Sequence, residues 1–171
     1  LDARWMMDTI VFLNQPVVVQ GKTLRYILVA INVFDRYLYA EPMETKEPAE
    51  VKIALRKLLT SAPKRPKLIS SDQGLEFKGV VSALLATKKI AQKYKDTGDV
   101  NGIGVIDKAI QSLKQRLSQL ATDGGTWASV LARAVAGINN TPKSAVLHGA
   151  TPKEVRDDDD VRFMLLQDQA K

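Results

Sequence analysis

The order of apolar and polar residues along the chain predicts a series of strands followed by helices. Residues 4–13 are apolar and β-prone, and the nearly continuous apolar run at 25–34 is typical of a strand buried on both faces. A turn at 20–24 separates these two segments. After a second turn, at Asp35 and Arg36, the alternating segment that ends at Pro42 is expected to be a third, antiparallel strand.

Helical spacing begins after this third strand. Thr45 is expected to be the N-cap of a helix that has Pro48 near its first turn. The next elements expected are a strand, a helix and a short edge strand, at 64–70, 77–89 and 90–95. A long amphipathic helix is predicted by apolar residues at steps of 4, 3, 4 and 3, namely Ile106, Ile110, Leu113, Leu117 and Leu120. Two further helices are expected at 126–140 and 151–155, the second capped by Thr151.

This order predicts an α/β fold, a mixed five-stranded sheet with helices on both faces. We expect one domain over residues 1–156, followed by an acidic and apolar C-terminal tail over 157–171. Residues 96–104 hold three glycines and are expected to be a flexible loop, with Gly98, Asn101 and Gly102 as its adaptable positions.

Composition narrows the function classes. The chain has 171 residues, a formal net charge of +6 and a pI near 9.5, which favours a polyanionic partner such as nucleic acid. It has no cysteine, so disulfides and cysteine-based zinc sites are excluded. No apolar run is long enough to span a membrane and no signal peptide is present, so we expect an intracellular protein with no membrane partner. Because the sequence lacks an initiator methionine, we expect it to be a piece of a longer protein.

Three acidic residues are candidates for chemistry. Asp8 lies within an apolar strand, Asp72 ends the fourth strand, and Asp107 lies in the first turns of the long helix. A buried carboxylate without partners costs several kcal/mol, so an Asp in the middle of an apolar strand indicates a specific role for Asp8. Each also has an ordinary explanation: Asp8 paired with a basic residue across the sheet, Asp72 as a turn former, and Asp107 favoured by the helix dipole.

Taken together, the three carboxylates point to a metal site made of oxygen ligands alone. Such sites suit Mg²⁺ or Mn²⁺ rather than zinc. Two such ions about 3.5 to 4 Å apart activate a water or hydroxyl and stabilise the leaving oxygen in phosphodiester chemistry.

The motifs around these acids resemble the catalytic core of retroviral and retrotransposon integrases. The resemblance rests on five segments from residue 5 to 155: "WMMD", "ILVAINVFDRYLYAEPM", "SDQGLEF", "NGIGVIDKAIQSLK" and "INNTPKSAVLHGATPKEV". The third matches a Ser/Thr-Asp-x-Gly-x-Glu/Gln-Phe motif closely, and the last matches an Asn-x-Thr-Pro-His-Ser-Ala pattern with Lys143 in place of His. Asn32 stands where many relatives have Asp, a change whose effect we expect to be structural.

The resemblance implies an RNase H-like polynucleotidyl transferase. Asp8, Asp72 and Asp107 would be the catalytic acids that bind two Mg²⁺ or Mn²⁺ ions, for DNA 3′-end processing and strand transfer. The family's third acid is normally Glu about 35 residues after the second, and Asp107 lies 107 − 72 = 35 residues on. Since Asp is one methylene shorter, its oxygens would fall about 1 to 1.5 Å short of a Glu's.

The resemblance also implies partners. Lys114, Lys108 and Gln111, on the polar side of the long helix, would contact DNA, and the 96–104 loop would close over the DNA end. We expect the domain to bind the ends of its own element and a target DNA, and to form a homodimer or higher multimer through helices such as 127–138. We also expect a host tethering protein, and a location in a nucleus or in a virus or retroelement particle.

Three alternatives stay open from the sequence. The domain could be a catalytically weakened or domesticated integrase-like DNA- or protein-binding domain, for which the Asp at position 107 is the main support. It could be an RNase H-type nuclease, distinguished by an RNA–DNA hybrid substrate. It could also be an interaction module whose acids are coincidental, which a metal titration would exclude.

Overall fold

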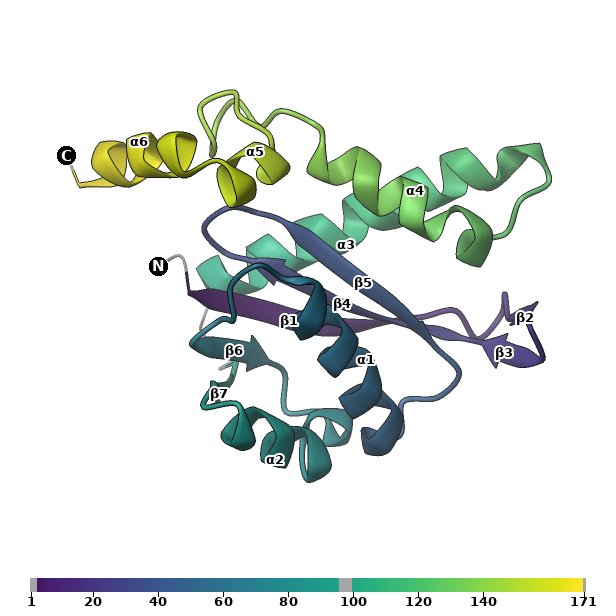
Figure 1. The fold of residues 1–171 in the computed structure, drawn as a ribbon. Helices are drawn as coiled ribbons and strands as arrows, with labels where there is room; N and C mark the ends of the chain where they lie inside the picture. The colour runs from purple at the N-terminus through teal and green to yellow at the C-terminus, as the bar shows by residue number, and fades with distance from the viewer. Residues whose placement is uncertain (1–2, 96–99, 171) are drawn as a thin grey trace.

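A five-stranded mixed sheet forms the centre of the computed structural model, which describes residues 3–95 and 100–170 (Figure 1). Its strands lie in the order β5-β4-β1-β6-β7. They comprise β1 (Arg4–Val11), β4 (Tyr26–Asn32), β5 (Leu38–Met43), β6 (Leu68–Ser71) and β7 (Ala91–Tyr94). β1, β4 and β5 are antiparallel neighbours, whereas β6 runs parallel to β1 and to β7. The expected mixed sheet is confirmed.

Helices cover both faces of this sheet, as expected (Figure 1). Their bounds are α1 (Pro48–Ser61), α2 (Val80–Thr87), α3 (Val100–Leu120), α4 (Trp127–Asn139), α5 (Pro152–Asp157) and α6 (Asp159–Gln169), with short 3₁₀ turns at Leu75–Phe77 and Ala121–Asp123. α1 and α2 bury one face with Trp5 and Met7, and α3 and α4 bury the other with Met6 and Ile10. The alternation along β1 therefore places Asp8 on the α3 side, because it shares the parity of Met6 and Ile10.

Turn chemistry explains two connections. Residues 17–24 form a hairpin of β2 (Val17–Val19) and β3 (Lys22–Leu24), where only a turn was expected. Gln20 and Gly21 both have positive φ, 50° and 79°, which matches the two-residue turns that favour hairpins. After β4, the Asn32 side-chain oxygen accepts hydrogen bonds from the N–H groups of Phe34 (2.8 Å) and Asp35 (3.2 Å). The expected structural role of Asn32 is confirmed.

Two helix starts differ from expectation. The N-cap of α1 is Glu47 rather than Thr45, whose hydroxyl instead donates to Glu50 (2.6 Å) and accepts from the Glu47 N–H (3.2 Å). Helix α3 already includes residues 100–104, so the loop expected at 96–104 was predicted too long. Asn101 and Gly102 belong to the first turn of α3, and Gly98 lies outside the described residues.

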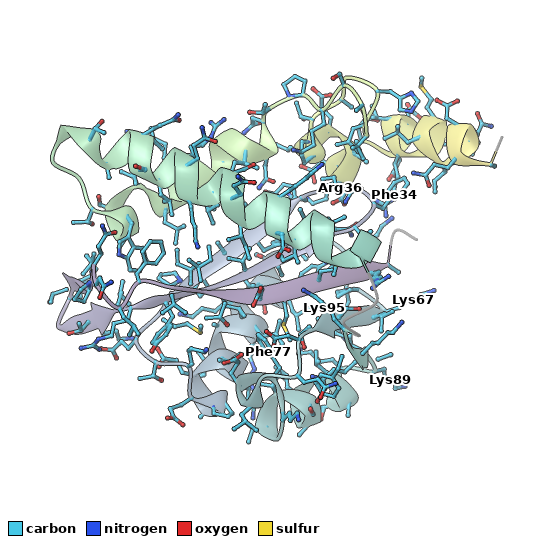
Figure 2. The ribbon with its side chains drawn as sticks, turned by 180° about the vertical axis from the view of Figure 1, so that it is seen from behind. Phe34, Arg36, Lys67, Phe77, Lys89 and Lys95 are labelled. Atoms are coloured by element: carbon cyan, nitrogen blue, oxygen red, sulfur yellow. The ribbon has the colours of Figure 1, made fainter. Side chains whose placement is uncertain are left out.

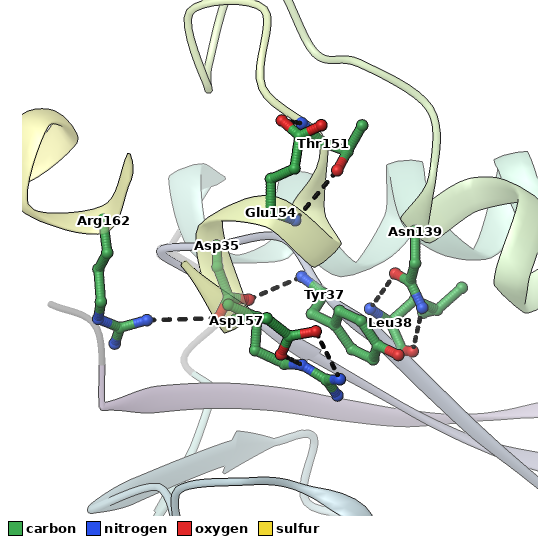
Figure 3. Close-up of polar contacts among 9 residues, drawn as sticks. Asp35, Tyr37, Leu38, Asn139, Thr151, Glu154, Asp157 and Arg162 are labelled. Carbon is green, nitrogen blue, oxygen red and sulfur yellow. Dashed lines mark hydrogen bonds and ion pairs between the residues drawn. The ribbon is translucent and has the colours of Figure 1, made fainter. Parts of the chain in front are cut away.

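The C-terminal tail is helical and packs on the domain. The carboxylate of Asp158 caps α6 by accepting from the N–H groups of Asp160 and Val161, and Leu165 is buried with Phe34. Arg162 of α6 lies 3.8 Å from the buried Asp35 (Figure 3). Within the described ranges, no helix is long and apolar enough to cross a membrane.

Candidate active site

Strand register brings Asp8 and Asp72 together. Arg4, Trp5 and Met6 of β1 pair in parallel with Leu68, Ile69 and Ser70 of β6. Continued by two residues, this register places Asp72 beside Asp8, at the point where β6 ends and β1 runs on. Side chains that follow the carboxyl ends of parallel strands meet at one sheet edge, which is a usual place for a site.

Helix α3 carries Asp107, which the sequence predicts as the third acid. It packs over β1 and β4 through Ile106, Ala109 and Leu113, and Asp107 is exposed beside that buried stripe. Asp107 lies seven residues after Val100, beyond the first helical turn. The helix dipole acts mainly within that first turn, so it no longer explains an acid at this position.

Burial and the charges of the other two acids both disfavour the charged form of Asp8. Burial is the largest cause that raises the pKa of Asp8, and the charges of Asp72 and Asp107 raise it further. A hydrogen bond from the Thr9 N–H (2.8 Å) and the charge of Lys95 act in the opposite direction on that pKa. A cation bound among these carboxylates would offset the same repulsion, so their environment fits a hard divalent ion.

The acids are not drawn together as metal ligands. Among the residues that the structure describes, no three His, Cys, Asp or Glu side chains are close enough to hold one ion. The carboxylate oxygens are the ligand type that Mg²⁺ or Mn²⁺ prefers, but these side chains would have to move closer together to bind one ion. No Lys or Arg in the described part of the chain forms an ion pair with Asp8, which argues against the simple cross-sheet pairing.

The loop after β6 explains the glycine of the second acid's motif. The Asp72 carboxylate accepts a hydrogen bond from the Gly74 N–H (2.8 Å), and Glu76 forms an ion pair with Lys46 (3.1 Å). A Cβ at residue 74 would overlap the Glu76 carboxylate and lie 2.9 Å from Asp72 Oδ1. Gly74 thus lets both carboxylates keep their positions. Glu76, held by Lys46, is a structural member of this motif.

Lys95 is a basic residue beside the candidate acids that the sequence analysis did not single out. It directly follows β7, and its N–H donates to the Ser71 carbonyl (2.6 Å), so it lies beside Asp72 on the neighbouring strand (Figure 2). The signal that could have found it is positional. Residues that follow adjacent parallel strands share one edge of the sheet.

The three residues expected to contact DNA are all exposed or half-exposed on α3 but line two different clefts. Lys108 and Gln111 line a cleft of about 620 Å³ beside Arg36, whereas Lys114 lines one of about 520 Å³ beside Trp127. Their contacts with DNA stay predictions.

Comparison with solved structures decides the fold. The catalytic core domain of BIV integrase superposes with a TM-score of 0.75, at 20% identity, over 95% of this chain and 99% of that one. The chain adopts the integrase catalytic-core fold. The HTLV-2 integrase core in complex with magnesium, in a trimeric form, matches with a TM-score of 0.71 at 13% identity, over 91% of this chain and 96% of that one. A simian T-cell lymphotropic virus intasome in complex with the PP2A regulatory subunit B56 gamma matches with a TM-score of 0.75 at 15% identity, over 92% and 55%.

Sequence comparison points in the same direction as this integrase-type fold. The chain is 30% identical over 144 residues to the Gag-Pol polyprotein of Koala retrovirus, covering 75% of this chain and 8% of the polyprotein. It is 26% identical over 132 residues to a putative uncharacterized transposon-derived protein of Caenorhabditis elegans, covering 76% and 45%. The chain thus spans less than half the length of these relatives. No family model matches it.

Proposed function

We propose that this domain is the catalytic core of a DNA integrase, which cuts DNA 3′ ends and joins them to a target. The observation that carries the proposal is the strand register that places Asp72 beside Asp8, with the charge of Asp107 also acting on Asp8, in an integrase-type fold. One neighbour of this fold is a core in complex with magnesium, which supports the same class of ion here. When bound, two Mg²⁺ or Mn²⁺ ions would supply activation of the attacking oxygen and charge stabilisation of the leaving one.

Each residue of the candidate site would have a separate role. Asp8, half-buried and bonded to the Thr9 N–H, would offer one oriented oxygen and keep the second for a cation. Asp72, held by the Gly74 N–H, and Asp107, on the rigid α3, would complete the oxygen ligands. Lys95 lies near the carboxylates, where it would face a DNA phosphate and reduce its repulsion from the acids.

A second candidate function is a weakened enzyme that keeps DNA binding. It is favoured by the Asp at position 107 and by the separation of the acids in the described residues. An RNase H-type nuclease would share the acids but require an RNA–DNA hybrid.

The test is metal-dependent cleavage and strand transfer with labelled DNA ends, in Mg²⁺ and in Mn²⁺, using the longest available parent protein. Activity on DNA that Asp8→Asn abolishes supports the integrase proposal. Activity on the hybrid alone would transfer the proposal to a nuclease. Absence of cleavage, together with retained DNA binding, would support the weakened enzyme.

A homodimer is part of the same proposal. The free edge of β5, α1 and α4 enclose an open groove of about 570 Å³, lined by Tyr39, Pro42, Leu58, Ala128, Ala132 and Val135 among others. Helix α4, expected from the sequence as the dimer surface, borders this groove through its small residues. Trp127 itself is not available, because it stacks on Phe12 and donates to the Gln15 carbonyl (2.7 Å). DNA ends, a host tethering protein and a nuclear or particle location remain proposals that rest on the relatives.

A further inference from the structure

A basic cleft lies along α3, beside the turn after β4. It has a volume of about 620 Å³ and is bounded by α3, by Arg36 and by the loop that follows α4. Its charged lining residues are Arg36, Lys108 and Lys143, and no Asp or Glu of the described residues belongs to its lining. A smaller cleft of about 240 Å³ shares Lys143 with it and adds Arg116, again without an acid from the described part of the chain.

The conformation and burial of Arg36 are both energetically unfavourable. Its φ is +62°, a conformation that a long L side chain rarely adopts. Its Nε is buried and has no hydrogen-bond partner among the described residues. A buried guanidinium donor without an acceptor costs free energy, which an anion in the cleft would recover.

Lys143 adds a second cation at the same place. Its backbone is fixed, because its N–H donates to the Ala150 carbonyl (3.0 Å) and its carbonyl accepts from Leu147 (3.0 Å) and Gly149 (3.1 Å). Burial, and after it the charge of Arg36, lowers the pKa of Lys143, so the two cations are close enough to repel each other. Asp35 is an acid whose charge acts on Arg36, but it does not belong to the cleft lining. Among the described residues, the charged lining of the cleft is therefore positive, which suits a phosphate.

The cleft lies on the opposite side of α3 from Lys95, as the labelled Arg36 and Lys95 show (Figure 2). Asp107 and Lys108 are neighbours on this helix, one beside the acids and the other in the cleft. Successive residues of one helix thus reach the two places.

We propose that Arg36, Lys108 and Lys143 bind a backbone phosphate of a DNA strand whose path crosses α3 from the acidic site, with Arg116 extending the track. This inference rests on the proposed function for the identity of the strand. Bidentate geometry suits Arg36 to a phosphate, and Lys108 and Lys143 would act as point charges.

The test compares the parent with an Arg36→Asn/Lys143→Met double variant. Asn tolerates positive φ, so this change preserves the turn. Affinity for a fluorescein-labelled duplex is measured by anisotropy against salt concentration. The magnitude of the slope of log K against log salt is expected to fall by about 0.9 for each duplex phosphate that the cleft no longer neutralises. Arg36→Lys/Lys143→Arg should retain the slope, and the control Arg56→Gln, an exposed residue on α1, should not change it.

A second measurement identifies the source of the phosphate. Thermal unfolding is followed with inorganic pyrophosphate, expected to stabilise the parent more than the double variant. An unchanged duplex slope in the double variant would overturn the inference, and stabilisation by pyrophosphate alongside it would assign the cleft to a free anion. Binding does not need cleavage, so an Asp8→Asn protein that binds with the parent slope separates this result from failure of the proposed chemistry.

Discussion

The side chain of Asn139, at the end of α4, binds both backbone polar groups of Leu38 in β5. Its Nδ2 donates to the Leu38 carbonyl (2.9 Å) and its Oδ1 accepts from the Leu38 N–H (2.8 Å) (Figure 3). β5 is an edge strand, so these two groups have no neighbouring strand. Asn139 thus supplies the missing partner and joins α4 to the sheet beside the proposed dimer groove.

Asn139→Ala is expected to lower the free energy of unfolding by about 2 to 6 kcal/mol. Two buried backbone groups would be left without their partners, at roughly 1 to 3 kcal/mol each. Urea denaturation measures the change. The neighbouring Asn140 is exposed and its side chain donates to the Ala136 carbonyl of its own helix, so Asn140→Ala should cost less than about 1 kcal/mol. Equal destabilisation in both variants would contradict this stabilising role of the Asn139–Leu38 hydrogen bonds.

Asp8→Asn is expected to raise the melting temperature in the absence of divalent ions. Asp8 is a half-buried carboxylate near two others, and burial and repulsion both disfavour its charge. With Mg²⁺, the parent should gain stability and the variant should gain little, because the cation would lack a ligand. Scanning calorimetry with EDTA and with Mg²⁺ gives the comparison. Glu47→Gln, which removes an exposed charge on the other face, should respond to Mg²⁺ as the parent does.

Asp107→Glu is expected to keep or increase strand cleavage. The longer side chain would extend the third carboxylate by about 1 to 1.5 Å toward the other two. Misplacement by about 1 Å can cost roughly 100-fold in rate, so the gain could reach that size. Single-turnover cleavage in Mg²⁺ measures it. A large drop in rate in Asp107→Glu, with Asp107→Asn inactive, would mean that the site is already adjusted to Asp.

Tyr39 is expected to make the fold sensitive to alkali. Burial, stronger than the opposing effect of Arg156, raises the pKa of Tyr39 to about 12 from 10.0. The neutral phenol is therefore favoured in the folded state: its stabilisation is complete below pH 10 and is lost as pH rises toward 12. Unfolding by urea across this window should show a decrease in stability that Tyr39→Phe lacks. Tyr26→Phe keeps the Tyr39 phenol and should retain that decrease.

Ala132→Asp is expected to shift the proposed dimer to monomer. Ala132 is exposed on α4 at the groove, so a charge there would be buried without a partner in a dimer. Light scattering after gel filtration gives the mass at several concentrations. Ala83→Asp, on the exposed face of α2, is the matched control and should leave the mass unchanged. A parent that is monomeric at every concentration would refute this interface.

The sequence by itself determined the local structure and the candidate acids. Alternation and helical spacing placed the five strands and most helices, and Thr151 was found as a cap because capping depends on neighbours a few residues away. Asp8 was conspicuous because an acid in an apolar strand is costly. The predicted start of α3 was wrong. The prediction relied on the low helix propensity of the glycine-rich segment, and packing can override propensity.

Only the tertiary structure decided which distant residues meet. Lys95 lies beside Asp72 because β6 and β7 pair in parallel with one register, and no local pattern fixes that register. Arg36 and Lys143 share a cleft although more than 100 residues separate them. The C-terminal tail packs as α6 because Leu165 is buried against Phe34, Leu147 and Val155, which come from other segments. Contacts of this kind depend on the whole fold, since their energy is gained only when every intervening element is in place.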